Sequence, residues 1–344
     1  MSCEQTIHRP EACRRPFFVG VDVGGTNIKI GLVDDDGKTF GFVSIDTHEP
    51  DGPQIAMQRV GQAIRELLKP MGLSLRDFQR VGLGTPGSQN IQTGMLIAPP
   101  NHPHWWNFPI VACLEKELGL PVSFANDANA AAFGEFWIGT GEKYSSMALL
   151  TLGTGVGGGI ISDSHLVVGA NSFGAECGHI IVDSAPNARL CTWGGGKGHL
   201  EAYASASAIV AIAKERLAQG AESTLRQQVP DVTAKKIYEA ALAGDTFSLE
   251  LIDQTAYYLG VGITSLVHTV DPGLVVLGGA MNFGGRTSPV GQRFMQRIRA
   301  TFCELSFDYV EAGTTIDFAI LGGDAGYLGA AGIARQTYHR TTST

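Results

Sequence analysis

The chain has 344 residues. Domains cluster near ~100–150 residues, so we expect two domains with a cleft between them rather than one small module. Hydrophobic residues make up 44% of the chain and charged residues 17%, which excludes a disordered protein. The net charge of −8 argues against nonspecific nucleic-acid binding and favours a small-molecule partner.

The first sixteen residues, MSCEQTIHRPEACRRP, alternate charge and proline without an apolar segment, so they predict a flexible tail rather than a signal peptide or an anchor. The six cysteines are scattered without a CxxC pair, which favours a reducing cytoplasm. Residues 144–162 carry no charge, but five glycines interrupt them, and we predict two strands and a turn there rather than a membrane helix.

Residues 17–33, FFVGVDVGGTNIKIGLV, read as an apolar β-rich run, a Gly-Gly-Thr turn and a second β-rich run, which is typical of a hairpin. Residues 147–168, MALLTLGTGVGGGIISDSHLVV, repeat this order. The chain therefore looks internally duplicated.

The remaining pattern alternates strands and helices, which predicts an α/β protein with parallel strand pairing. Helices are expected near residues 55–69, 111–118, 128–135, 200–219, 233–243, 248–270 and 326–335, and strands at 80–83, 122–125, 274–277 and 316–321. The expected domains are a flexible tail (1–16), a small N-terminal α/β domain (17–123), a large C-terminal α/β domain (124–321), a helix that packs back on the first domain (322–337) and a tail (338–344).

The two glycine turns, at Gly24-Gly25 and Gly157-Gly158-Gly159, suit a phosphate because backbone N–H groups can face an anion without an intervening Cβ. The alternative is that each is only a tight hairpin turn. The hydroxyls of Thr26 and Thr154 beside them favour a nucleotide. No GxxxxGK[ST] motif is present and no helix directly follows the glycines, so neither a P-loop nor a dinucleotide fingerprint is indicated.

Two acidic positions follow predicted strands. Asp22 ends the first strand, where a carboxylate can hold Mg²⁺ through water, or can instead cap the turn. Asn126-Asp127 stands between a strand and a helix, where the helix N-terminus favours an ionised carboxylate. Asp127 is placed like a general base, and an ordinary N-cap pair is the alternative.

Glu176 and His179 in GAECGH, and Glu201 in GHLEAY, lie among glycines, which suits recognition of sugar hydroxyls by ionised acceptors. The alternatives are an exposed first-turn helix acid for Glu201 and a satisfied buried histidine for His179.

In this order and spacing, the segments DVGGTNIK (22–29), NDANAA (126–131), GTGVGGG (153–159) and GAECGH (174–179) resemble the ROK family of sugar kinases and regulators, over residues 17–335. The similarity is closest to the bacterial glucokinases of that family. It implies an actin-like ATPase (ribonuclease H-like) fold, in which two α/β domains flank a cleft and close on ATP and a hexose.

The resemblance also implies the roles of individual residues. Asp127 is the expected base for the 6-hydroxyl of the sugar, whereas the Mg²⁺ role expected of Asp22 comes from its position at the end of the first strand. The positions that match sugar-binding residues are Asn101, Asn126, Asp127, Glu176, His179 and Glu201. Those that match the ATP site are Gly24, Gly25, Thr26, Lys29, Gly153, Thr154, Gly155, Gly157, Gly278 and Gly279.

One segment departs from the family pattern. The family commonly carries a zinc site formed by the GH histidine and three cysteines, whereas here residues 191–201 read CTWGGGKGHLE. His179, Cys191 and His199 supply three ligands, but a closed structural zinc site takes four. We therefore predict no tightly bound structural zinc.

The sequence leaves several alternatives open. The sugar can be fructose, mannose or N-acetylglucosamine instead of glucose, and the donor polyphosphate instead of ATP. A regulator of this family carries a helix-turn-helix before the first hairpin, for which sixteen residues are too few, and a non-catalytic sugar-binding protein would lack the base or a glycine turn. Family analogy suggests a dimer or a tetramer.

Overall fold

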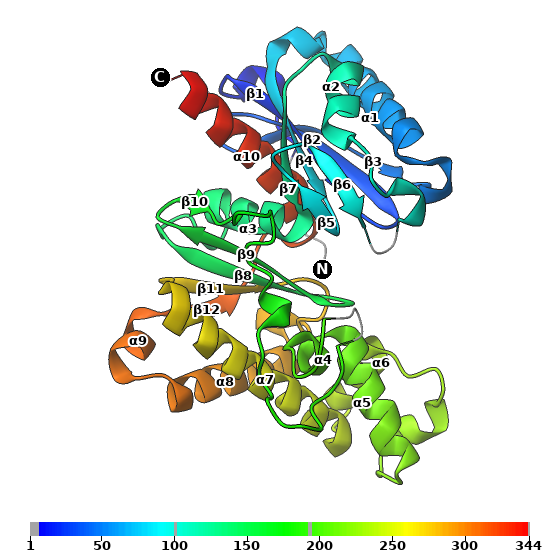
Figure 1. Cartoon of the computed structure of the whole chain (residues 1–344), viewed down its shortest axis with the longest axis vertical. Helices are drawn as coiled ribbons and strands as arrows, with labels where there is room; N and C mark the ends of the chain where they lie inside the picture. Colours follow the sequence, from blue (N-terminus) through cyan, green and yellow to red (C-terminus); the bar gives the residue numbers. More distant parts are fainter. Residues whose placement is uncertain (1–6, 100–101, 192–194, 343–344) are drawn as a thin grey trace. The chain divides into compact units, whose positions relative to one another are not determined.

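The computed structural model describes residues 7–99, 102–191 and 195–342. It divides the chain into two compact units. Unit 1 comprises Met1–Glu142, Leu166–Gly174 and Leu321–Thr344, and unit 2 comprises Lys143–His165 and Ala175–Ile320. Each unit is built around its own five-stranded sheet with helices packed on it (Figure 1).

The sheet of unit 1 has the strand order β3-β2-β1-β4-β7. Strands β1, β2 and β3 pair antiparallel, whereas β4 pairs parallel with both β1 and β7. The bounds are β1 Phe17–Val23, β2 Asn27–Val33, β3 Thr39–Asp46, β4 Phe78–Thr85 and β7 Val122–Asn126. A short hairpin of β5 (Ser88–Asn90) and β6 (Met95–Ala98) follows β4.

Helices cover both faces of this sheet, so its strands are buried on both sides. Val19 and Val21 belong to the core shared with α1 (Pro53–Leu68) and α2 (Ile110–Leu118), while Phe18 faces a second core with Tyr327 and Leu328. This alternation along β1 follows from the two-residue period of a strand. Figure 1 shows α1 and α2 together on one side of the strands and α10 (Ala325–Thr342) on the other.

The sheet of unit 2 repeats the same plan, with the order β10-β9-β8-β11-β12. β8 pairs antiparallel with β9 and parallel with β11, and β11 pairs parallel with β12. The bounds are β8 Met147–Leu152, β9 Val156–Ser162, β10 His165–Leu166, β11 Leu274–Gly278 and β12 Thr315–Phe318. The duplication predicted from the two glycine hairpins is therefore present in the topology.

The helices of unit 2 include most of those expected. They are α4 (Glu201–Ala204), α5 (Ala206–Ala218), α6 (Ala234–Leu242), α7 (Thr246–Val270), α8 (Pro289–Leu305) and α9 (Asp308–Gly313). Helix α8 is absent from our sequence-based prediction, although Ser288 caps it and Pro289 occupies its first position, which is a recognisable start signal. Among the described helices, none combines the length and the apolar character needed to cross a bilayer.

The unit boundary differs from the expected one after residue 123. Unit 1 continues to Glu142, so it also contains α3 (Asp127–Ile138). The reason is long-range pairing, because β7 joins β4 in the sheet and α3 packs closely on α10 at Gly134 and Gly329. Helix α10, reached only after the whole of unit 2, lies in unit 1.

Both expected tails were partly wrong. In residues 7–16, the amide of Arg14 donates to Asp34 at 2.8 Å and the guanidinium of Arg15 pairs with Asp77 at 3.1 Å. At the other end, the expected tail 338–344 begins inside α10, which extends to Thr342. His339 in this segment is anchored on unit 1, since its Nε2 lies 2.6 Å from a buried Asp35 carboxylate oxygen. These polar contacts hold both segments on unit 1.

Candidate active site

The carboxyl ends of three parallel strands meet at one edge of the sheet in unit 1. Asp22, near the end of β1, is in register with Gly84 of β4, and Thr85 at the end of β4 is in register with Asn126 of β7. Parallel α/β sheets bind ligands at this edge. The structure therefore places the predicted Mg²⁺ residue and the predicted base along the same edge, although they are 105 positions apart in the numbering.

Asp127 is the first residue of α3, and Asn126 is its N-cap. The amide of Ala128 donates to Asn126 Oδ1 at 2.9 Å and lies 2.8 Å from Asp127 Oδ1. Asn126 thus caps the helix, and Asp127 stands beside its positive end, which favours an ionised carboxylate, while its role as a base stays a prediction. Asp127 is half-buried.

The first glycine turn joins β1 to β2. The amide of Gly24 donates to the carbonyl of Asn27 at 2.9 Å, and Gly25 and Thr26 are exposed. No glycine of this turn, nor of the turn at Gly153–Gly159, has a positive φ. The amides are therefore arranged by the hairpin turns themselves rather than by alternating right- and left-handed residues.

Asp22 lies against the first turn of α10. A Cβ on Gly326 would come within 2.3 Å of an Asp22 carboxylate oxygen, so only glycine permits this approach. Burial raises the pKa of Asp22 from 3.8 to about 6, against the opposing influence of Lys29. A cation beside this carboxylate would favour its ionised form, which fits the Mg²⁺ role.

Lys29 also contacts the segment that leads into α10. Its ammonium group donates to the carbonyl of Gly323, in the 3-10 turn Gly322–Asp324. Burial raises the pKa of the next residue, Asp324, while Lys29 opposes the shift. Our sequence analysis missed Asp324, because nothing local to the GGD segment shows that the chain returns to β1 and β2 there.

In unit 2, the second glycine turn and Gly278-Gly279 follow two adjacent parallel strands. Thr151 of β8 is in register with Gly278 of β11. Gly279 has φ +89°, and a Cβ there would lie 2.3 Å from the carbonyl oxygen of Leu152. The chain can therefore pass the end of β8 only with glycine at this position.

Glu201 is buried at the start of α4 and connects two segments of unit 2. Its Oε2 accepts a hydrogen bond from the amide of Val156 at 2.8 Å, and its Oε1 accepts one from the thiol of Cys191 at 3.2 Å. The alternative of an exposed helix acid is thus wrong. The carboxylate is fixed beside the second glycine turn.

Glu176 and His179 both have exposed side chains, so His179 is not the satisfied buried histidine that we weighed as an alternative. Glu176 precedes the 3-10 turn Cys177–His179, which packs on β9. Asn101 lies outside the described residues.

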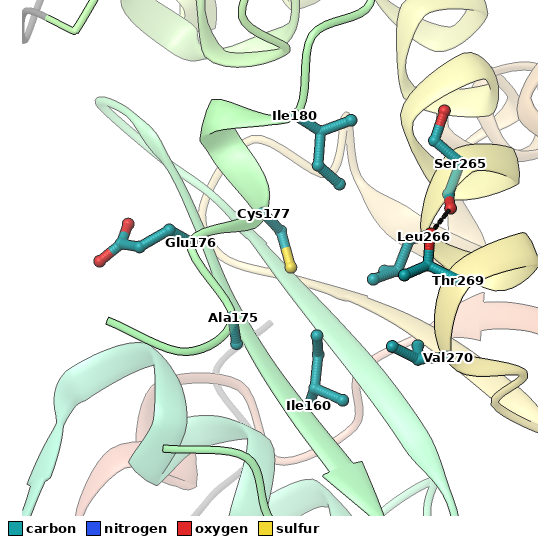
Figure 2. A pocket seen from close by; sticks show the side chains of 9 residues that line it. All are labelled: Ile160, Ala175, Glu176, Cys177, Ile180, Ser265, Leu266, Thr269 and Val270. Atoms are coloured by element: carbon teal, nitrogen blue, oxygen red, sulfur yellow. Dashed lines mark hydrogen bonds between the residues drawn. The ribbon is translucent and has the colours of Figure 1, made fainter. Parts of the chain in front are cut away.

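Unit 2 also contains a cavity of about 250 Å³ beside α7. Its lining is mainly aliphatic: Ile160, Ala175, Glu176, Cys177, Ile180, Ser265, Leu266, Thr269 and Val270. Figure 2 shows the carboxylate of Glu176 pointing away from this cavity. A sugar needs several polar partners, so this cavity is not where we place it.

The sequence profile of the ROK family matches residues 18–337 of this chain. The chain belongs to the ROK family. Its fold is accordingly the actin-like ATPase fold, with the repeated sheets described above.

Individual ROK proteins are similar over nearly their whole length. A glucokinase from Halalkalibacterium halodurans is 36% identical over 323 residues, which are 93% of this chain and 95% of the relative. The crystal structure of a ROK hexokinase from Thermus thermophilus has a TM-score of 0.80 at 30% identity, covering 96% and 100% of the two chains. A ROK glucokinase from Streptomyces griseus, solved in complex with glucose and AMPPNP, has a TM-score of 0.74 at 32% identity, covering 93% and 100%.

The zinc site that the ROK family implies is present only in part. The ligand atoms of His179, Cys191 and His199 lie within 4.8 Å of one another, and the two Nδ1 atoms are 2.9 Å apart. Among residues 7–99, 102–191 and 195–342, no other histidine, cysteine, aspartate or glutamate joins this group. The donor set fits three positions of a zinc coordination sphere and leaves the fourth unfilled.

Proposed function

We propose that this chain transfers the γ-phosphoryl group of ATP to the 6-hydroxyl of a hexose, giving glucose 6-phosphate and ADP when the hexose is glucose. The observation that carries this proposal is the position of Asp127, which stands at the N-terminus of α3 on the same sheet edge as Asp22. The naming of similar ROK proteins as glucokinases supports the same reaction.

In this reaction Asp127 accepts the proton of the 6-hydroxyl as the hydroxyl oxygen attacks the γ-phosphorus. Phosphoryl transfer depends mostly on positioning and on neutralising charge, and the base removes a single proton late in the step. The N-terminus of α3 favours negative charge at this carboxylate, and the cap made by Asn126 fixes the start of the helix. The Asp127 carboxylate can then accept the hydroxyl proton.

For ATP, we assign contacts in both units. Asp22 would hold Mg²⁺ through water, and Mg²⁺ would neutralise charge on the phosphates. The residues proposed for the nucleotide are Gly24, Gly25, Thr26, Lys29, Gly153, Thr154, Gly155, Gly157, Gly278 and Gly279. Gly326 lies against the Asp22 carboxylate and Gly279 against the Leu152 backbone, so both positions need glycine for the chain to pack there.

For the sugar, we assign Asn101, Asn126, Asp127, Glu176, His179 and Glu201. Carboxylates and amides of this kind accept from and donate to several hydroxyls, so fructose, mannose and N-acetylglucosamine remain candidate substrates beside glucose. Polyphosphate remains the alternative donor. The cytoplasmic location, the dimeric or tetrameric state and the absence of a tightly bound structural zinc stay predictions.

A coupled assay of ADP release over a panel of these four hexoses tests the proposal. We expect glucose to give the highest kcat/KM with ATP and Mg²⁺. Parallel assays with polyphosphate identify the donor. A chain that binds glucose but phosphorylates no hexose with either ATP or polyphosphate would instead be a sugar sensor, and the proposal would be wrong.

A further inference from the structure

Glu135 is a buried acidic residue near the end of α3, and its side chain is 0% exposed. Burying a carboxylate is costly unless hydrogen bonds satisfy its oxygens. Its Oε2 accepts from the amide of Thr140 at 3.0 Å, and its Oε1 accepts from the amide of Leu321 at 2.7 Å. The first contact closes the end of the helix, whereas the second joins residues 186 positions apart in the sequence. Glu135 therefore ties α3 to a distant segment of unit 1.

Leu321 is the residue at which the chain returns to unit 1. It directly precedes the 3-10 turn Gly322–Asp324, and its carbonyl accepts from the amide of Asp324 at 3.1 Å. The amide of Leu321 is thus bound to Glu135, while its carbonyl is bound to the turn. The carboxylate of Glu135 therefore fixes the start of the segment that leads into α10.

This segment contacts two residues that we assign to phosphate and Mg²⁺. The carbonyl of Gly323 accepts from the ammonium group of Lys29, and Gly326 packs against the carboxylate of Asp22. Gly323 and Gly326 lie two and five positions after Leu321. A shift of Leu321 would therefore displace both contacts together.

The packing of α10 on α3 leaves little room for such a shift. A Cβ on Gly134 would lie 2.5 Å from the carbonyl oxygen of Ala325, and a Cβ on Gly329 would overlap the carbonyl of Ala130. The two helix backbones are therefore in direct contact beside Glu135. Closely packed interiors transmit small displacements, so the hydrogen bond from Leu321 to Glu135 helps to set where the first turn of α10 lies on α3.

The same helix carries the proposed base. Asp127 is the first residue of α3, and Glu135 follows eight positions later, which is about 12 Å along the axis at 1.5 Å per residue. A single α-helix thus holds Asp127 at its start and the segment that contacts Asp22 and Lys29 near its end.

We propose that Glu135 is a positioning residue for the nucleotide: by holding Leu321, it places Lys29 and Asp22 for phosphate and Mg²⁺. This inference rests on the proposed function, because it needs ATP and Mg²⁺ to bind at Lys29 and Asp22. Since Glu135 acts through Leu321, its loss should weaken nucleotide binding and leave sugar binding largely unchanged. Residues that orient metal-binding groups from behind typically contribute 10–100-fold to metal affinity or activity.

Isothermal titration calorimetry with AMPPNP and saturating Mg²⁺, and separately with glucose, tests this role. Glu135→Met removes both acceptor oxygens at similar volume. Leu321→Pro removes only the donor N–H, because the φ of Leu321 is −76°, which proline adopts. We expect each variant to raise the Kd for AMPPNP about tenfold, while the Kd for glucose changes little. Both variants remove the same hydrogen bond, so the double variant should bind AMPPNP no more weakly than the weaker single variant.

Two variants serve as matched controls. Leu321→Ala shortens the side chain but keeps the amide that donates to Glu135. Asp245→Ala removes a carboxylate that likewise joins two backbone amides, those of Thr224 and Ser248 at 2.8 Å each, but Asp245 lies in unit 2 and is assigned to neither ligand. Both controls should keep the original Kd for AMPPNP. A merely structural role for Glu135 would lower the melting temperature without a selective loss of AMPPNP binding.

The possible results separate the two proposals. If the unmodified chain binds AMPPNP, and folded Glu135→Met and Leu321→Pro bind it equally well, the positioning role is wrong while the proposed function stands. The positioning role is also wrong if both variants lose AMPPNP and glucose binding to the same extent. If the unmodified chain binds neither ligand, the proposed function fails and the positioning role fails with it. If Glu135→Met does not fold, Leu321→Pro decides between these results.

Discussion

The backbone amide of Val156 donates a hydrogen bond to Oε2 of Glu201 at 2.8 Å. Val156 begins β9, directly after the turn formed by Gly153–Gly155. A carboxylate assigned to the sugar therefore also fixes a turn assigned to ATP. Its other oxygen accepts the thiol of Cys191, so Glu201 is held from two sides.

Glu201 variants separate these two roles. Glu201→Ala should raise the KM for glucose at least about tenfold and also raise the KM for ATP, because hydrogen bonds to charged groups contribute about 1.5–3 kcal/mol. Glu201→Gln keeps an acceptor for Val156, so the KM for ATP should change little while the KM for glucose still rises. Steady-state kinetics with each substrate varied measure both. An unchanged KM for glucose in both variants would remove Glu201 from the sugar site.

Asp127→Asn should lower kcat by about 10²–10⁴ while the Kd for glucose changes little, since general-base catalysis contributes a factor of this size. The assay is ADP release, combined with calorimetry of glucose binding. Asp308→Asn is the matched control, because Asp308 is likewise the first residue of a helix but lies outside the proposed site. Near-normal turnover in Asp127→Asn would exclude Asp127 as the base.

The pKa of Asp22, raised by burial from 3.8 to about 6, predicts an acid limb in the activity. Below about pH 6 the carboxyl takes up a proton and no longer supports Mg²⁺, so kcat/KM for ATP should fall about tenfold per pH unit. Asp22→Asn should have low kcat/KM at every pH and lack this limb. A wild-type profile that stays flat down to pH 5 would contradict the assignment.

The raised pKa of Asp22 also affects the free energy of unfolding. Activity should rise with pH, whereas the contribution of Asp22 to stability should fall with pH. The folded chain binds the Asp22 proton more tightly than the unfolded chain does, so the stabilisation by protonation is complete below about pH 3.8 and is lost as the pH rises through about 6. The melting temperature of Asp22→Asn relative to the unmodified chain should therefore increase between pH 4 and pH 7. Thermal melts in the absence of ATP and Mg²⁺ measure this difference, and a constant difference would contradict the burial of an ionised carboxylate.

His179, Cys191 and His199 supply three converging metal ligands, and the described residues supply no fourth. We therefore predict weak, reversible zinc binding instead of a structural zinc. Metal analysis after dialysis against a chelator should find far less than one zinc per chain. The chelator should also not lower the melting temperature by more than about 2–4 °C, the shift that about 1 kcal/mol produces. One zinc per chain that survives dialysis would overturn the prediction. The zinc content of Cys191→Ser, compared with that of the control Cys303→Ser at an exposed cysteine, would then show whether this cluster holds the metal.

Local sequence patterns were sufficient for much of the fold. The apolar runs beside the two glycine turns predicted β1, β2, β8 and β9, and the Asn126-Asp127 pair predicted the start of α3. These features depend on neighbours only a few residues away, so their signals are short and readable. The sequence also determined the family, because its motifs occur in a fixed order along the chain.

Other features were decided by contacts between distant residues. The return of α10 to Asp22, the contact of Glu201 with Val156 and the contact of Glu135 with Leu321 join positions between about 45 and 300 residues apart. No local propensity encodes such pairs, because the burial and hydrogen bonding that fix them exist only once the sheets have formed. The sequence by itself determined the family and the type of fold and predicted which residues carry the chemistry, whereas the tertiary structure decided which of them hold one another in place.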